Sequence, residues 1–169
     1  DNAQVYSAAL TDQLMLRMDL DAGLRGALER QEFHLVYQPQ IDLATGRVRS
    51  VEALLRWTHP VRGLVPPLEF IPLAEHNGLI GPLGSWVLRT ACTQAARWNR
   101  NGPPVRVAVN LSPVQLGTPG LAQSVIDVLR ECGLASELLE LEVTEGALLE
   151  NTEATRAAME SLRRHGICM

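Results

Sequence analysis

The alternation that decides the fold lies in the stretch Ser50-Val51-Glu52-Ala53-Leu54-Leu55-Arg56-Trp57. Apolar side chains fill every second position of this stretch, and the other face carries a carboxylate at Glu52 and a guanidinium at Arg56. A period of two residues is typical of a β-strand, so we predict a strand with one face in the core. Its other face is either solvated or lines a functional site.

Length and composition limit the classes of function. The chain has 169 residues, of which 46% are hydrophobic and 20% are charged, and this predicts one soluble globular domain or part of one. Its net charge of -4 argues against a nucleic-acid polymer as partner, because such binding depends on a basic surface. A small phosphorylated ligand stays possible, since a few arginines or a metal ion can hold one.

The cysteines and the hydropathy pattern indicate in which cellular compartment the domain is expected. Three cysteines, Cys92, Cys132 and Cys168, lie far apart and form no CxxC pair, so we expect reduced thiols rather than a disulfide framework or a zinc site. No stretch is long and apolar enough to span a bilayer, and no signal-peptide core precedes the domain. We therefore expect a cytoplasmic domain, whose parent chain could still carry a membrane anchor.

The order of predicted elements indicates an α/β fold. A short turn around Gly46 joins a strand over residues 33–41 to the strand that carries Glu52, so these two strands are predicted to be antiparallel. Further strands are expected at 105–111 and 139–144, with a last one beginning at 167, and helices at 83–99, 121–132 and 153–165 and from Pro67. Alternating strands and helices predict parallel pairing, which fits either a β/α barrel or a doubly wound sheet.

A leading segment precedes this pattern. Leucines and other apolar residues at near-helical spacing run through residues 1–18 and continue to Leu28. We interpret residues 1–18 as a linker helix that packs against the domain or a dimer mate, and residues 19–169 as the domain itself.

Polar residues recur on the non-core faces of four predicted strands, at Gln38, Glu52, Asn110 and Glu142. In β/α folds, sites gather at the carboxyl ends of the parallel strands, so these side chains could converge. Two carboxylates and a carboxamide suit a hard cation such as Mg²⁺ or Mn²⁺ better than zinc, and Arg56 could bind a phosphate oxygen.

Structural roles for the same residues stay open at this point. A single glutamate in a strand is usually solvated or paired, Asn110 could cap the turn that begins at Ser112, and Gln38 before Pro39 could be a bulge residue. Glu140 lies deeper than Glu142 on the same face, which favours a pairing with an arginine. The four histidines show no metal-binding spacing, and glycine-rich phosphate loops are absent from the sequence.

From about Leu20 to its last residue the chain resembles the EAL family of cyclic di-GMP phosphodiesterases. The resemblance rests on the segments Val36-Tyr37-Gln38-Pro39, Glu52-Ala53-Leu54-Leu55-Arg56-Trp57, Phe70-Ile71-Pro72-Leu73-Ala74-Glu75, Val109-Asn110-Leu111-Ser112 and Leu139-Glu140-Leu141-Glu142-Val143-Thr144-Glu145. It implies a TIM-like (β/α) barrel with an antiparallel first strand, and metal-dependent hydrolysis of cyclic di-GMP to the linear dinucleotide pGpG. One or two Mg²⁺ or Mn²⁺ ions are implied as cofactors.

The resemblance also implies roles for single residues. Glu52, Asn110 and Glu142 would be catalytic metal ligands. Gln38, Leu54 and Arg56 would contact the dinucleotide. Glu145 would lie outside the metal ligands, without binding the metal itself, and would steady a catalytic loop.

The family pattern continues beyond Met169, with an aspartate pair, a lysine and a further glutamate. We therefore expect this chain to hold only the N-terminal half of the barrel and to be inactive by itself, whereas the intact domain would be an enzyme. A homodimer and an upstream GGDEF or sensor domain are further expectations. The competing interpretation is a non-catalytic EAL-type module that binds cyclic di-GMP or a protein partner.

Overall fold

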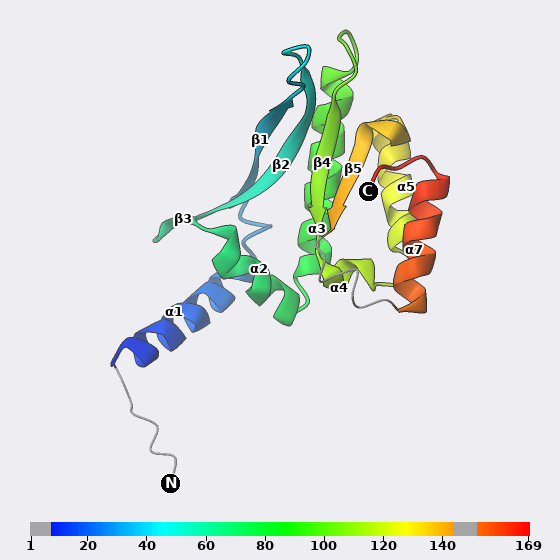
Figure 1. The fold of residues 1–169 in the computed structure, drawn as a ribbon. Coiled ribbons are helices and arrows are strands. Elements are labelled where there is room, and N and C mark those ends of the chain that lie inside the picture. The colour runs from blue at the N-terminus through cyan, green and yellow to red at the C-terminus, as the bar shows by residue number, and fades with distance from the viewer. Residues whose placement is uncertain (1–7, 144–151) are drawn as a thin grey trace.

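A five-stranded mixed sheet organises the molecule (Figure 1). The computed structural model describes residues 8–143 and 152–169. The strand order is β1-β2-β4-β5, and β3 pairs with β2 off this path. The bounds are β1 Phe33–Ile41, β2 Val48–His59, β3 Gly63–Val65, β4 Arg106–Leu111 and β5 Leu139–Val143.

Strand directions confirm the sequence prediction. Strands β1 and β2 pair antiparallel, while β4 lies parallel to β2, and β5 lies parallel to β4. The β1–β2 turn is held by Asp42, whose Oδ1 accepts hydrogen bonds from the backbone N–H groups of Ala44 and Thr45. Gly46 completes it with φ 66°, a conformation that glycine adopts without steric cost.

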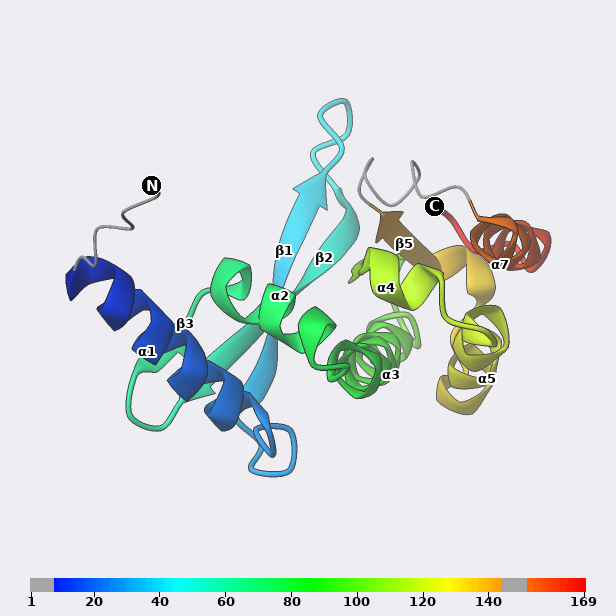
Figure 2. The same ribbon diagram turned by 90° about the horizontal axis from the view of Figure 1, so that it is seen from below.

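The helices are α1 Ala8–Leu24, α2 Pro67–His76, α3 Ile80–Trp98, α4 Pro113–Leu116, α5 Leu121–Cys132 and α7 Glu153–Arg164, with a 3₁₀ turn, η1, at Ser136–Leu138. Helix α3 lies against one face of the sheet, and α5 and α7 continue that layer beside it (Figures 1 and 2). Helices α1 and α2 pack together at one end. No helix in the described ranges covers the opposite face of β2, β4 and β5 (Figure 2).

The two largest of three apolar clusters among the described residues fix this arrangement. The larger cluster joins β2, β4 and β5 to α3, α5 and α7, with Val107, Leu139 and Leu162 fully buried. The smaller cluster is aromatic and lies where α1 and α2 meet the first strands, around Trp57 and Phe70, whose rings stand edge to face at 5.5 Å. Burial of such rings is a large part of core stability, so both ends of β2 are anchored.

Four details differ from the sequence prediction or extend it. The Pro- and Gly-rich segment after His59 contains a short strand, β3, which pairs with β2. Helix α3 begins at Ile80, earlier than expected, and α1 continues past residue 18 to Leu24. Cys168 forms a single parallel bridge with Glu140, as expected for a strand beginning near residue 167.

The cysteines and the hydropathy of the helices can be described directly. All three cysteines are unpaired, and burial raises the pKa of the Cys92 thiol to about 12. Among the helices that the structure describes, none has the length and apolar composition required to cross a bilayer.

Candidate functional site

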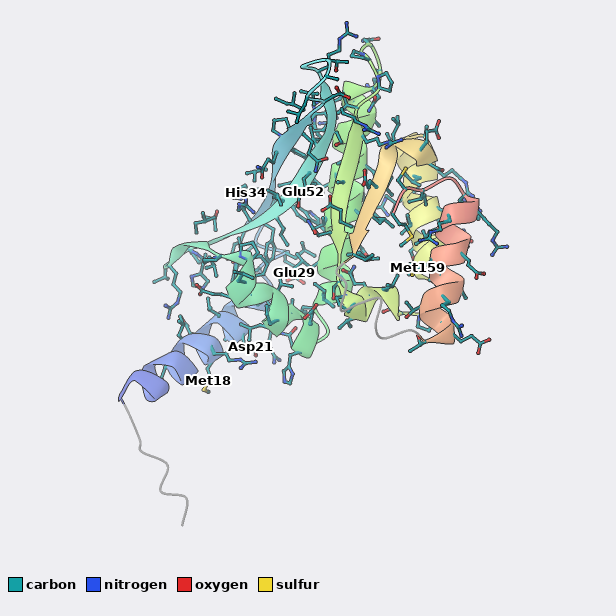
Figure 3. The ribbon with its side chains drawn as sticks, in the orientation of Figure 1. Met18, Asp21, Glu29, His34, Glu52 and Met159 are labelled. Atoms are coloured by element: carbon teal, nitrogen blue, oxygen red, sulfur yellow. The ribbon has the colours of Figure 1, made fainter. Side chains whose placement is uncertain are left out.

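Neighbouring strands bring Glu52, Asn110 and Glu142 onto one face of the sheet. Glu52 pairs in register with Ala108, two residues before Asn110, and Asn110 pairs with Glu142. Because side chains two residues apart on a strand share a face, all three project to the same side. Figure 3 labels Glu52 on β2, on the side of the sheet away from α3. The predicted convergence is therefore confirmed for these three residues.

Asn110 and Glu52 are in direct contact. The Asn110 amide Nδ2 donates a hydrogen bond of 2.8 Å to Glu52 Oε1, across the β2–β4 pair. The alternative interpretation, in which Asn110 caps the next turn, is wrong, because Ser112 is the N-cap residue of α4 and accepts from Val114 N. With its nitrogen committed to Glu52, Asn110 keeps its amide oxygen for another partner.

The surroundings of Glu142 disfavour its charged form. Partial burial raises its pKa above the usual range for glutamate, and the nearby carboxylates of Glu52 and Glu140 add to the increase. The expected arginine partner of Glu140 is not found in the part of the chain that the structure describes, where the ion pairs involve other acids. Three acidic side chains thus gather with no described cationic side chain paired to them.

A cavity of about 280 Å³ adjoins these residues, between β2 and β4 on one side and α2 and α3 on the other. Asn110 and Glu142 line it together with Leu54 and Arg56, two of the residues expected to contact a ligand. The remaining wall is largely apolar and includes Pro67, Ile71, Ile80, Leu83 and Val87. A cavity with an apolar wall and a polar edge suits a ligand that has both flat apolar parts and charged groups.

The other predicted site residues have different surroundings. Gln38 is exposed on β1 and pairs in register with Glu52, so it lies beside the same site. The register irregularity of β1 falls between Gln40 and Ile41, which shows that the bulge interpretation of Gln38 is wrong. Arg56 donates from Nη1 to the Leu55 carbonyl at 2.9 Å. Glu145 lies outside the described residues.

Glu75 is a residue at this site to which the sequence assigned no role. It lines the cavity from α2, and its Oε1 accepts a 2.5 Å hydrogen bond from Ser112 Oγ. Both residues belong to segments that carry the family resemblance, but only the tertiary structure brings them together. The available sequence signal was a carboxylate at the end of an otherwise apolar helical segment, Phe70 to Ala74.

The donor chemistry fits a hard divalent cation. The described residues contain no cluster of three or more His, Cys, Asp or Glu side chains placed to hold a metal ion, and the candidate set is two carboxylates with one carboxamide. Oxygen donors of this kind suit Mg²⁺ or Mn²⁺, and Mg²⁺ in particular keeps several waters beside its protein ligands. The crowding of negative charge around Glu142 is the kind of cost that a cation offsets.

Comparisons with known proteins agree on one family. The family model described as EAL domain matches residues 21–169. The cyclic di-GMP phosphodiesterase NbdA of Pseudomonas aeruginosa is 42% identical over 170 residues, which cover 100% of this chain and 22% of NbdA. Curated relatives of this kind are much longer, and the chain spans about a fifth to a quarter of the length of those it matches.

Solved structures extend the agreement to the fold. The PaMucR phosphodiesterase in its c-di-GMP complex superposes with a TM-score of 0.84 at 42% identity, covering 88% of this chain and 61% of that one. The FimX EAL domain from Pseudomonas aeruginosa bound to c-di-GMP superposes with a TM-score of 0.78 at 28% identity, covering 88% and 60% of the two chains. The mixed α/β arrangement described above is therefore that of EAL domain structures.

Proposed function

The chain belongs to the EAL domain family, and on that basis we propose that its site takes part in the metal-dependent hydrolysis of cyclic di-GMP to linear pGpG. The observation that carries the proposal is the meeting of Glu52, Asn110 and Glu142 on one open sheet face, beside a cavity. The names of relatives support the substrate, since NbdA is called a cyclic di-GMP phosphodiesterase and PaMucR was solved with c-di-GMP.

The proposed substrate matches the chemistry of the site. Cyclic di-GMP carries flat bases and two charged phosphodiesters. We assign the cavity edge at Leu54 and Arg56 to substrate contact, with Arg56 able to replace its bond to the Leu55 carbonyl by bonds to a phosphate. Gln38, exposed beside Glu52, is assigned to the same role.

Glu52, Asn110 and Glu142 are assigned to hold Mg²⁺ or Mn²⁺. When bound, such an ion supplies charge neutralisation at the phosphate and acidifies a water molecule. The chain's own contribution is orientation: the 2.8 Å hydrogen bond fixes Glu52 and the amide plane of Asn110 relative to each other. Glu145 stays a proposed supporting residue behind these ligands.

We further propose that the sheet forms part of a TIM-like (β/α) barrel with an antiparallel first strand. The antiparallel β1, the parallel strands β2, β4 and β5, and the helical layer on one face support this. In such a barrel the face that carries Glu52 would point inward, and polar groups at strand ends would form the site.

A second function stays in contention, namely a non-catalytic module that binds cyclic di-GMP or a protein partner. What favours it is that Leu54, Arg56 and the apolar cavity wall can serve binding without any metal. Retention of all three candidate ligands favours the enzyme, because a pure receptor does not need them.

The deciding experiment compares turnover with binding in the complete protein. We expect linearisation of cyclic di-GMP with Mg²⁺ or Mn²⁺, loss of turnover in Glu52→Ala, and weaker ligand binding in Arg56→Ala. Binding with no turnover in any divalent cation would support the receptor, and normal turnover by Glu52→Ala would refute the metal assignment. The matched control is Glu69→Ala, which removes an exposed carboxylate from helix α2.

A further inference from the structure

Glu75 occupies a position between the helical end of the molecule and the candidate site. It lies in the last turn of α2, is partly buried, and lines the cavity. Its carboxylate Oε1 accepts from Ser112 Oγ at 2.5 Å, a length typical of a hydrogen bond from a hydroxyl to a charged acceptor. Such a bond is about twice as strong as one between neutral groups.

Ser112 uses its hydroxyl group twice. The hydroxyl proton goes to Glu75, and the same oxygen accepts from Val114 N at 3.2 Å as the N-cap of α4. A serine hydroxyl has only one hydrogen to donate, so Glu75 determines the direction in which this group points. The cap is reciprocal, because Gln115 Oε1 accepts from Ser112 N at 3.2 Å.

Helix α3 also contacts this turn, through Gly84. The Gln115 side chain lies directly over Gly84, where an added Cβ would overlap Gln115 Nε2. Any larger residue at position 84 would therefore force the Gln115 side chain to move. Helix α2 is therefore hydrogen-bonded to Ser112, and helix α3 packs against Gln115. Both contacts are made to the same short turn.

We infer that Glu75 is a positioning residue that sets the turn after β4 and thereby the orientation of Asn110. Asn110 and Ser112 are separated by one residue, Leu111, which ends β4 and is buried, so displacement of the turn is transmitted to the Asn110 amide. The contact with Ser112 stands by itself, and only its consequence at the site rests on the proposed function. Outer groups that orient a ligand typically change metal affinity by about 10- to 100-fold when removed.

The experiment measures the local stability of the turn and the metal affinity of the site separately, in the complete protein. Hydrogen exchange at residues 110–117 reports the turn, and Mn²⁺ titration followed by electron paramagnetic resonance reports the site. We expect Glu75→Ala to increase exchange at 110–117 and to weaken Mn²⁺ binding by about tenfold. Glu75→Gln keeps an acceptor oxygen for the Ser112 hydroxyl and is expected to restore most of both signals. Glu69→Ala, on the exposed face of α2, is the matched control and should change neither.

The outcomes separate this inference from the proposed function. Unchanged exchange in Glu75→Ala, or a Glu75→Gln variant as impaired as Glu75→Ala, overturns the positioning role. If the wild-type protein binds no Mn²⁺ while exchange still responds to Glu75→Ala, the positioning contact stands and the metal assignment fails. If Glu75→Ala does not fold, Glu75→Met keeps the length of the side chain without its acceptor and replaces it in both measurements.

Discussion

Asn110 Nδ2 donates to Glu52 Oε1 at 2.8 Å, and this bond ties β4 to β2 at the candidate site. Because Asn110 is exposed, we expect the bond to stabilise the fold by about 1 kcal/mol, so the pair contributes to the fold as well as to the candidate site. If these residues hold a metal as proposed, stability without metal and affinity for metal are coupled at the pair, and variants can separate the two quantities.

Asn110→Asp replaces the donor with a second carboxylate that faces Glu52. In EDTA we expect Tm to fall by roughly 5 °C, because a hydrogen bond is exchanged for repulsion between like charges. Addition of Mg²⁺ or Mn²⁺ should recover much of the loss, since a cation screens both acids. Calorimetry with and without divalent ions tests this. Asn101→Asp, which adds the same charge at an exposed loop position, is the control, and equal shifts in both variants would contradict the prediction.

Glu142→Gln removes one charge from the crowded acidic group. The raised pKa of Glu142 reflects its burial and the proximity of Glu52 and Glu140, so the neutral amide should be easier to accommodate. We expect equal or higher stability in EDTA together with weaker Mn²⁺ binding. Chemical denaturation and metal titration measure the two effects. Glu137→Gln, at an exposed position, should leave both unchanged; a loss of stability in Glu142→Gln would contradict the electrostatic interpretation.

Glu32 predicts a dependence of stability on pH. Its pKa is lowered chiefly by the hydrogen bond from Arg30, at 2.5 Å, and also by the 2.9 Å bond from Trp57 Nε1. Because the folded-state pKa lies below the unfolded value, this stabilisation is complete above the unfolded pKa, about 4.3, and is lost as the pH falls through the folded one. Glu32→Gln should therefore be less stable than wild type at pH 7 and nearly equal to it at about pH 3.

Urea unfolding at both pH values measures this difference. Glu29→Gln, an exposed neighbour in the same turn region, is the matched control and should track the wild type throughout. A deficit in Glu32→Gln that persists at the lower pH would assign the effect to packing against Trp57 rather than to charge.

Gly84→Ala tests the packing contact between helix α3 and the turn after β4. The new Cβ requires the Gln115 side chain to move, so we expect loss of the cap bond to Ser112 N, which costs about 1 kcal/mol and offsets the roughly 0.5–1 kcal/mol that alanine gains in a helix. Gly81→Ala provides the comparison, because it lies in the same helix with open space around the added Cβ. That variant should gain about 0.5–1 kcal/mol from helix propensity. Equal effects of the two substitutions in thermal unfolding would refute the close contact.

Local pattern alone predicted β1, β2, β4 and β5, their directions and the shared face of the acidic residues, but not the short strand β3. Alternation around Glu52 predicted a strand with one buried face, and the short turn at Gly46 required β1 to be antiparallel. The spacing of later strands and helices predicted parallel pairing, which β4 and β5 show. These features follow from side-chain period and loop length, which are properties of neighbouring residues.

Only the tertiary structure decided which groups touch. The Asn110–Glu52 bond depends on the register between β2 and β4, and the Glu75–Ser112 bond depends on how α2 packs beside the turn after β4. The cavity wall likewise combines residues from α2, α3 and two strands. Register and helix packing are set by the burial of apolar surface over the whole core, so residues far apart in sequence meet at distances that no local pattern specifies.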